Sequence, residues 1–464
     1  MTSQEAQETL TKLGITPEKY NSELSAAAES GHAERVRLLL AAPGIDVNKA
    51  DKFIDTPLLA AIKKGHTECV KLLLAAPGID VNKADKCGWT PLFAALQKGH
   101  TECVKLLLTA PGIDVNKDNS LLFWAVHHDN VECVRLLLAA PGIDVNYLNP
   151  LYSAAGKSNT KCMRLLLANP GVDVNKVNIM GRTPLNNAAG NGSLEHVRLL
   201  LATPGIVVNM ADHDGLSPLN AAAKNGHTEC VKLLLATPGI DVNMADHYGW
   251  TPLIAAANYG HTECVKLLLA TPGIDVNMAN HYGWTPLIAA AISGHTECVK
   301  LLLATPGIDV NMANKYGWTP LKAAANNGHT ECVKLLLATP GIDVNKADKF
   351  NGTPLIAAAK NGLTECVKLL LATPGIDVNK AGKFIGPPLI AALRKGHTEC
   401  VKLLLTAPGI DVNRTNWNGV APLSKAAREG HTEHMRLLLA APGTDVNMAD
   451  KYGWTPLNYA ATFG

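Results

Sequence analysis

Several features that would point this chain to a particular class of protein are scarce. Its 42 lysines and arginines are nearly balanced by 40 aspartates and glutamates, so it lacks the net charge typical of a general nucleic-acid binder. No apolar run approaches the roughly 18 residues that a membrane-spanning helix requires. Aromatic residues make up only 5 % of the chain. We therefore expect no membrane span and no nucleic-acid partner.

The usual sequence marks of catalysis are also missing. We find no glycine-rich phosphate loop, no serine nucleophile elbow and no His-Glu-x-x-His metalloprotease pattern. The first twenty residues, MTSQEAQETLTKLGITPEKY, have no apolar core of the kind found in signal peptides. We therefore expect a protein that is not an enzyme, with no catalytic residues and no cofactor.

What the chain does contain is one long internal repeat. Ten of the twelve intervals between successive Pro-Gly dipeptides that precede a form of IDVN are 34 residues long, and the other two are 30 and 29. A period between about 20 and 50 residues indicates a solenoid, propeller or array. The thirteen dipeptides begin at Pro43, Pro77, Pro111, Pro141, Pro170, Pro204, Pro238, Pro272, Pro306, Pro340, Pro374, Pro408 and Pro442.

One unit, residues 249–282, shows how each repeat should fold. Thr251 can cap a helix whose first position is Pro252, and Gly260 should end that short, alanine-rich helix. The following CVKLLL segment is apolar around most of its circumference, which is typical of a helix packed between neighbours. Pro272 and Gly273 should end this second helix. Each unit therefore reads helix, turn, helix, loop, and buries its apolar surface by stacking.

The motif GWTPLxxAAxxGHTECVKLLL followed by GIDVN resembles the ankyrin repeat, over roughly residues 22–464. The resemblance implies an all-α solenoid of helix-turn-helix units joined by β-hairpin-like loops. It also implies a scaffold that binds proteins, and it permits hydroxylation of the asparagine in the Asp-Val-Asn turns. Two departures from the family are units of 34 rather than 33 residues and the absence of the usual His after TPL.

The repeat pattern predicts three regions. Residues 1–21 should form a helical N-terminal cap, with Leu10, Leu13, Ile15 and Tyr20 covering the first unit. Residues 22–450 should form the ankyrin-repeat array, with shortened loops within 112–170. Residues 451–464 correspond to the first half of a fourteenth unit, which either caps the array or belongs to a longer chain.

The sequence HTEC occurs seven times and pairs a His with a Cys three positions later, which is compatible with zinc-ligand spacing. Each unit offers only two such ligands, however, whereas zinc needs three or four. We therefore expect no metal site. The His should bond to backbone between units, and the Cys should fill the core as a small apolar side chain.

Ten of the eleven cysteines occupy this one slot of the repeat. Equivalent positions on stacked helices should lie roughly 8–10 Å apart, beyond the roughly 7 Å that a disulfide can bridge. Ten buried free thiols favour a reducing, cytoplasmic compartment, with delivery into a host cell left open. The remaining thiol, Cys87, lies in a loop beside Trp89.

The positions that vary between units are the natural candidates for recognition. The loop tips carry Tyr and Trp, which dominate interface hot spots, and the ends of the first helices carry a changing pair of residues. By resemblance to ankyrin proteins we place a partner-binding surface on these two rows, centred on residues 213–327. The predicted residues are Tyr248, Trp250, Asn258, Tyr259, Tyr282, Trp284, Ile292, Ser293, Tyr316, Trp318, Asn326 and Asn327.

The alternative for the aromatic residues is that each Trp packs on the neighbouring loop and only shapes the stack. For the whole chain, the favoured function is a monomeric, non-catalytic scaffold for a protein or extended peptide. A structural spacer is one alternative, because repeated, nearly identical surfaces would suffice for it. A targeting module or effector whose activity lies in a partner is another.

Overall fold

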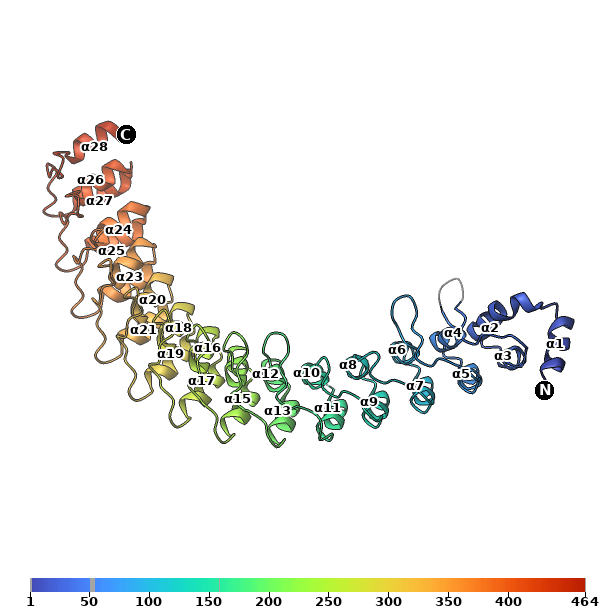
Figure 1. The fold of residues 1–464 in the computed structure, drawn as a ribbon. Coiled ribbons are helices and arrows are strands. Elements are labelled where there is room, and N and C mark those ends of the chain that lie inside the picture. Colours follow the sequence, from blue (N-terminus) through green and yellow to red (C-terminus); the bar gives the residue numbers. More distant parts are fainter. Residues whose placement is uncertain (1, 51–54, 158, 464) are drawn as a thin grey trace. The chain divides into compact units, whose positions relative to one another are not determined.

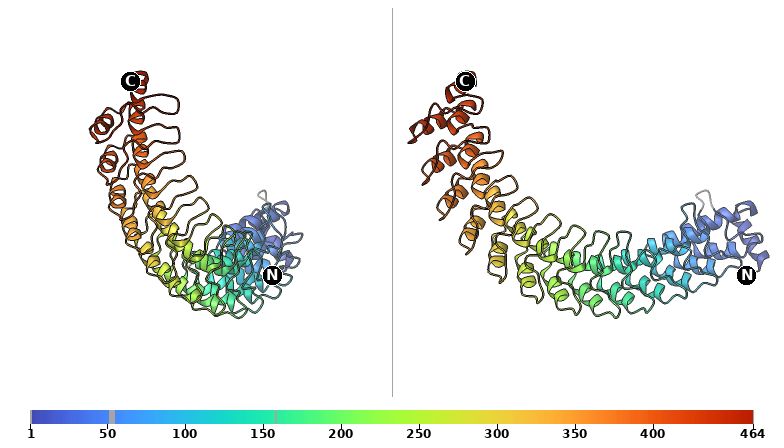
Figure 2. Two further views of the ribbon diagram at one scale, coloured as in Figure 1. Left: turned by 90° about the vertical axis from the view of Figure 1, so that its left-hand side faces the viewer. Right: turned by 60° about the vertical axis from the view of Figure 1, so that its left-hand side comes forward.

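The computed structural model describes residues 2–50, 55–157 and 159–463, which form helices joined by turns (Figures 1 and 2). Helices follow one another in pairs along the sequence, as the 34-residue period predicts. The chain divides into two compact units, residues 1–188 with 193–207, and residues 189–192 with 208–464. Among the described residues, no helix is long and apolar enough to cross a membrane.

The helices of the first compact unit, together with α12, which ends two residues beyond it, are α1 Ser3–Lys12, η1 Pro17–Lys19 (3-10), α2 Tyr20–Glu29, α3 Ala33–Leu40, α4 Pro57–Lys64, α5 Thr67–Leu74, α6 Pro91–Gln97, α7 Thr101–Leu108, α8 Leu121–His127, α9 Val131–Leu138, α10 Pro150–Gly156, α11 Thr160–Leu167, α12 Pro184–Gly190 and α13 Leu194–Leu201. Those of the second are α14 Pro218–Lys224, α15 Thr228–Leu235, α16 Pro252–Tyr259, α17 Thr262–Leu269, α18 Pro286–Ser293, α19 Thr296–Leu303, α20 Pro320–Asn327, α21 Thr330–Leu337, α22 Pro354–Lys360, α23 Thr364–Leu371, α24 Pro388–Lys395, α25 Thr398–Leu405, α26 Pro422–Arg428, α27 Thr432–Ala440 and α28 Pro456–Phe463.

The pair α16 and α17 shows why the repeat folds this way. The hydroxyl oxygen of Thr251 accepts a hydrogen bond from the backbone N–H of Ile254 at 3.2 Å, and Pro252 occupies the first helical position. Gly260 ends the helix at φ 76°, a left-handed conformation that glycine adopts without steric cost. The chain then turns directly into α17 at Thr262. The caps predicted from the sequence are therefore confirmed.

The core is made by stacking pair upon pair. First helices pack on first helices, as α16 does on α18 and α20 does on α22, and second helices pack likewise, as α17 does on α19. In one repeat the first helix buries Ala255–Ala257 completely or nearly so, and the second helix buries Val265 and Leu268. Alanine on the first helix lets the neighbouring first helix approach closely. Because adjacent pairs cover the apolar surface of each pair, each unit is stable only beside its neighbours.

The loops that reach to the next pair are hairpin turns without strands in the described part of the chain. At one tip, the N–H of Asp246 donates to the carbonyl of Trp250 at 3.0 Å, which closes the turn. The N–H of His281 on the next tip donates to the carbonyl of Tyr248, also at 3.0 Å. Adjacent tips are therefore joined by single backbone bonds rather than by a continuous sheet.

A row of asparagines links successive pairs at the Asp-Val-Asn turns. The Oδ1 atom of Asp275 accepts the N–H of Asn277 at 3.0 Å, which is the local turn that the sequence predicts. The same Asn277 side chain also reaches forward. Its amide donates to the carbonyl of Gly307 at 2.7 Å, and its Oδ1 accepts the N–H of Asp309 at 2.9 Å. Each such asparagine therefore satisfies two backbone groups of the next repeat.

Two loops of the first compact unit are shorter than the rest. Residues 109–120 join α7 to α8 and residues 139–149 join α9 to α10, whereas residues 270–285 join α17 to α18. The helices on both sides are retained, and Asn149 caps α10 by accepting the N–H of Tyr152 at 3.0 Å.

The first helix, α1, covers the neighbouring α3 with only part of the predicted apolar set. Leu10, Ile15 and Tyr20 are buried, but Leu13 is 62 % exposed. Our expectation for Leu13 was wrong because that residue follows the last turn of α1 and lies on its outer side. At the other end of the chain, α28 buries Tyr459, whose hydroxyl donates to the carboxylate of Asp450 at 2.6 Å.

Candidate partner-binding site

The loop tips of the second compact unit carry a row of exposed tyrosines. Tyr248, Tyr282 and Tyr316 are 57 %, 50 % and 54 % exposed. Their backbones are held by the tip turns, since each Tyr N–H donates at 2.9 Å to the side-chain oxygen of the Asp or Asn two residues earlier. These rings are therefore presented to solvent on a fixed backbone.

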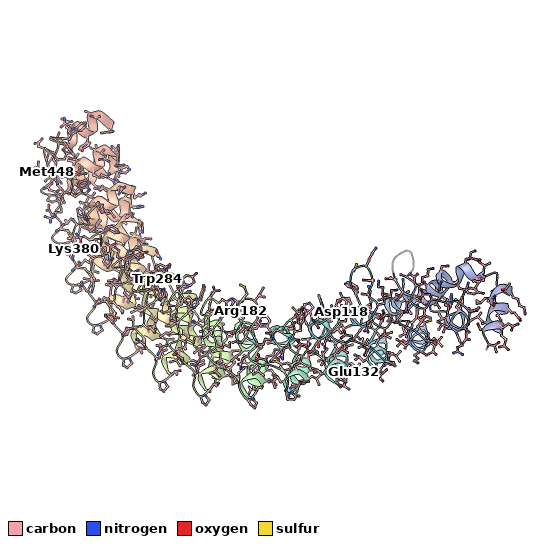
Figure 3. All side chains as sticks on the ribbon, viewed as in Figure 1. Asp118, Glu132, Arg182, Trp284, Lys380 and Met448 are labelled. Carbon is pink, nitrogen blue, oxygen red and sulfur yellow. The ribbon has the colours of Figure 1, made fainter. Side chains whose placement is uncertain are left out.

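The tryptophans two residues further on are more deeply placed. Trp250, Trp284 (labelled in Figure 3) and Trp318 are half-buried. The ring centroids of Trp250 and Trp284 lie 6.4 Å apart, so these two indoles pack on each other across adjacent tips. The Trp side chains therefore shape the stack and also expose part of their surface, whereas the Tyr side chains are the accessible part of the row.

The predicted residues at the ends of the first helices form a second row. The hydroxyl of Ser293 lies 3.5 Å from the amide oxygen of Asn258, and the side chain of Asn327 donates to the carbonyl of Ile292 at 2.7 Å. The ring of Tyr259 is 50 % exposed and stacks on a histidine of its own repeat, His261. The predicted residues of this row thus meet their neighbours one repeat away.

The recurring histidines bond to backbone, as the sequence predicts. Immediately before α17, for example, the Nε2 atom of His261 lies 3.0 Å from the carbonyl oxygen of Lys224 in the preceding repeat. The equivalent contacts of His66, His227, His295, His329 and His397 measure 3.0–3.1 Å. These imidazoles therefore act as bridges between repeats.

The cysteines of the repeat lie in the core. All eleven cysteines are free; ten are buried and Cys87 is exposed. Burial raises the pKa of the thiols in this slot, and for Cys230 and Cys162 it raises the pKa to about 11. Neutral thiols of this kind are poor nucleophiles and behave as small apolar side chains.

A pocket of about 370 Å³ lies next to the predicted row, in a region that the sequence prediction placed outside its centre. Trp318 and Asn326, both predicted, contribute to its wall. The residues that the prediction missed are Lys322, Asp348, Phe350, Gly352, Ile356, Ala357, Lys360, Phe384 and Ile385. Most of this lining is apolar, with one buried charge pair at its base.

Two breaks in the repeat pattern lie at the pocket. Gly352 stands in the register that Trp250, Trp284 and Trp318 occupy in the preceding repeats, so an indole is missing from the row. Lys322 stands where the neighbouring first helices carry isoleucine. The tip turn survives because Asn351, in place of the usual glycine, adopts a φ of 56°, which asparagine tolerates better than most residues.

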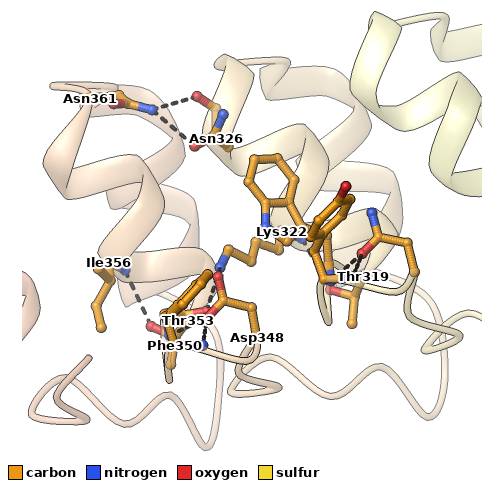
Figure 4. Close-up of polar contacts among 12 residues, drawn as sticks. Thr319, Lys322, Asn326, Asp348, Phe350, Thr353, Ile356 and Asn361 are labelled. Carbon is orange, nitrogen blue, oxygen red and sulfur yellow. Dashed lines mark hydrogen bonds and ion pairs between the residues drawn. The ribbon is translucent and has the colours of Figure 1, made fainter. Parts of the chain in front are cut away.

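The charge pair at the base joins Lys322 to Asp348 (Figure 4). The side chains of Lys322 and Asp348 are 5 % and 8 % exposed, and the ammonium group donates to the Asp348 carboxylate. It also donates to the carbonyl of Gly352 at 2.7 Å and lies 5.3 Å from the centre of the Trp318 ring. Desolvation lowers the pKa of Lys322, and the bond to Asp348 opposes that shift only in part.

The missed residues could have been found from the positions at which one repeat departs from the usual residue. A Gly in a Trp register and a Lys in an Ile register are both visible in the aligned repeats. The prediction instead ranked loop tips by the aromatic residues that they carry. It therefore favoured the complete tips at 248–250 and 282–284 over the incomplete tip at 348–352.

The architecture defines a class of protein: a solenoid of stacked helix pairs whose loop tips and first-helix ends form the variable surface. A family model described as ankyrin repeats, in three copies, matches residues 24–119, 77–149, 122–212, 205–280, 269–348, 340–416 and 389–464. The chain therefore belongs to the ankyrin repeat family, whose members are in general protein-interaction modules. A comparison with curated proteins finds no match for the chain.

Proposed function

We propose that this chain is a non-catalytic scaffold that binds a protein or extended peptide through its loop tips and first-helix ends. The observation that supports the proposal best is the row of exposed Tyr248, Tyr282 and Tyr316 on backbone-bonded tips. Tyrosine offers a large contact area at low conformational cost, and a rigid backbone reduces what is lost on binding. A pure spacer would have no need of such a row.

We also propose that the protein is monomeric and works in a reducing, cytoplasmic compartment. The set of ten buried free thiols supports the compartment, since cysteines of this number persist unpaired where disulfides do not form. The balanced charge of the whole chain supports a protein partner over a nucleic acid.

The experiment is a photo-crosslinking capture from a lysate of the source organism. A photoreactive phenylalanine analogue is placed at Tyr282 on the tip row or at Lys300 on the outer side of α19, which is also exposed. We expect a discrete crosslinked partner only with the probe at position 282, and loss of that partner when Tyr248 and Tyr316 are changed to Ala. Equal crosslinking from both positions, or no dependence on the tyrosines, contradicts the proposed surface.

A further inference from the structure

The pocket beside Trp318 has the size and lining of a receptor for one bulky side chain. Its volume of about 370 Å³ is lined by Trp318, Phe350, Phe384 and aliphatic groups of α22. The rings of Phe350 and Phe384 lie 6.1 Å apart and are 56 % and 57 % exposed. Two such exposed rings beside a cavity present an apolar surface in excess of what the stack itself needs.

The pocket lies at a tip where the repeat lacks its usual indole. In the preceding repeats, Trp284 follows Ile254 of the repeat before it by 30 positions, and Trp318 follows Ile288 by the same interval. At Gly352 the backbone is in place but the side chain is not. A Cβ built there would lie 3.0 Å from the Lys322 ammonium, so the charge pair now stands where the indole would enter.

The rim of the pocket is basic. Lys349 and Lys383 are exposed on the two tips that flank it, and Lys360 at the end of α22 lines it. Arg394 and Lys395, at the end of the next first helix, are exposed as well. The ammonium group of Lys383 lies 5.5 Å from the centre of the Phe384 ring.

The carboxylates that could neutralise this rim lie elsewhere. Asp348 is committed to Lys322 at the base of the pocket. The other carboxylates of residues 315–395 are on the second helices α21 and α23 or in the Asp-Val-Asn turns, namely Glu331, Glu365, Asp343 and Asp377. The tips and first-helix ends around the pocket therefore carry an excess of positive charge.

We infer that this pocket takes a Trp or Phe side chain from an acidic peptide segment, with flanking carboxylates held by Lys349, Lys360 and Lys383. This inference rests on the proposed scaffold function and specifies the partner's chemistry. The apolar lining supplies the anchor site, and the basic rim selects for acidic flanks and speeds association. The pocket has room for one bulky side chain, which favours a peptide with a single anchor over a nucleic acid, whose successive bases would need a series of stacking rings.

A filled-pocket variant follows directly from the neighbouring repeat. The triple substitution Lys322→Ile, Asp348→Asn, Gly352→Trp copies Ile288, Asn314 and Trp318 of the preceding repeat. It closes the space and leaves net charge unchanged, because one cation and one anion are removed together. A rim variant, Lys349→Glu with Lys383→Glu, keeps the pocket open and reverses its charge. The charge-matched control is Lys300→Glu with Lys334→Glu on the outer helices, where both residues are exposed.

The test selects binders to the full-length chain from a displayed library of randomised peptides of about twelve residues, enough for one anchor and its flanks on both sides. We expect enriched peptides to share one Trp or Phe flanked by Asp and Glu. Their affinity, measured by fluorescence polarisation, should fall at least about tenfold with the filled-pocket variant and with the rim variant, and change less than about twofold with the control. Circular dichroism checks that each variant keeps its helices.

The outcomes separate the inference from the proposed function. Enriched peptides that lose binding when Tyr248 and Tyr282 become Ala, but bind the filled-pocket variant normally, overturn the pocket and retain the scaffold. A failure to enrich any peptide on either surface contradicts both. An oligothymidylate that binds wild type, displaces the peptides and is rejected by the filled-pocket variant overturns the acidic-peptide assignment in favour of a single-stranded nucleic acid.

Discussion

Removing one partner of the buried Lys322–Asp348 pair should destabilise the repeats around it, and removing both should be far less costly. Asp348→Asn leaves an ammonium group in a site that is 5 % exposed, with only the Gly352 carbonyl and the Trp318 ring for compensation. Loss of one member of a buried pair typically costs about 3–5 kcal/mol. Because two favourable contacts remain, we expect about 3 kcal/mol.

Lys322→Ile should cost less, because the carboxylate that it leaves behind stays well bonded. The Oδ1 atom of Asp348 accepts the N–H groups of Phe350 and Gly352, both at 2.8 Å. We expect a cost of about 1 kcal/mol, and about the same for the double variant, in which no charge remains buried. The resulting coupling energy, about 3 kcal/mol, is at the upper end of the range for residues in contact.

Because Lys322 can lose its proton, the stability cost of Asp348→Asn is limited and depends on pH. Its pKa is lowered in the folded chain relative to 10.5, so the unfolded chain binds more protons between the two values, and stability rises with pH across that window. The loss of Asp348 removes a contact that raises this pKa. The cost of Asp348→Asn should therefore shrink as the pH is raised from 7 toward 10, and Lys322→Ile should abolish that pH dependence.

The assay is hydrogen exchange of backbone amides in α20 and α22, because long repeat arrays do not unfold in a single transition. A loss of about 3 kcal/mol corresponds to exchange that is faster on the order of a hundredfold. Amides of α27 provide the internal control. Exchange at the wild-type rate in Asp348→Asn would contradict the expected cost, as would a double variant that is as unstable as the two single costs added together.

Three further predictions concern the repeat itself. Asn277→Ala removes two bonds to the next repeat and should lower local stability by about 2 kcal/mol, seen as faster exchange in α18 but not in α26. Burial, with His431 nearby, lowers the pKa of His434 in the folded chain. The unfolded chain therefore binds more protons as the pH falls from 6.5 through the lowered pKa, and the folded chain loses stability over that range. His434→Cys restores the usual residue of the slot and should reduce the fall in melting temperature between pH 7 and 5; an unchanged slope would contradict this. Finally, a thiol reagent should label Cys87 alone in the native protein and all eleven cysteines after unfolding; rapid labelling of Cys230 in the native state would be inconsistent with its burial.

The repeating part of the fold was predictable because each of its causes is local. Thr251, Pro252 and Gly260 fix the first helix by capping, and the apolar CVKLLL segment fixes the second, within a few residues of one another. The position of Leu13 was missed because a single turn of chain decides whether that side chain faces α3 or solvent. Apolar character alone carried no information on this choice.

The pocket was not predictable by the same route, because its cause is a relation between two repeats. Lys322 and Gly352 are 30 positions apart and meet only after stacking. Each departure is visible when the repeats are aligned, but only the stacking of one repeat on the next brings the missing indole and the added charge together. The forward reach of Asn277 was missed for the same reason, since a local turn already accounted for its presence.

The asparagine that joins each repeat to the next has a consequence for how such a chain changes in length. Every joint uses the same donor and acceptors, so excision or duplication of one whole 34-residue module regenerates an identical junction on both sides. Recombination between the near-identical coding segments for residues 227–245, 261–279 and 295–313 would therefore yield longer or shorter proteins that still fold, each carrying its recognition elements at a new separation.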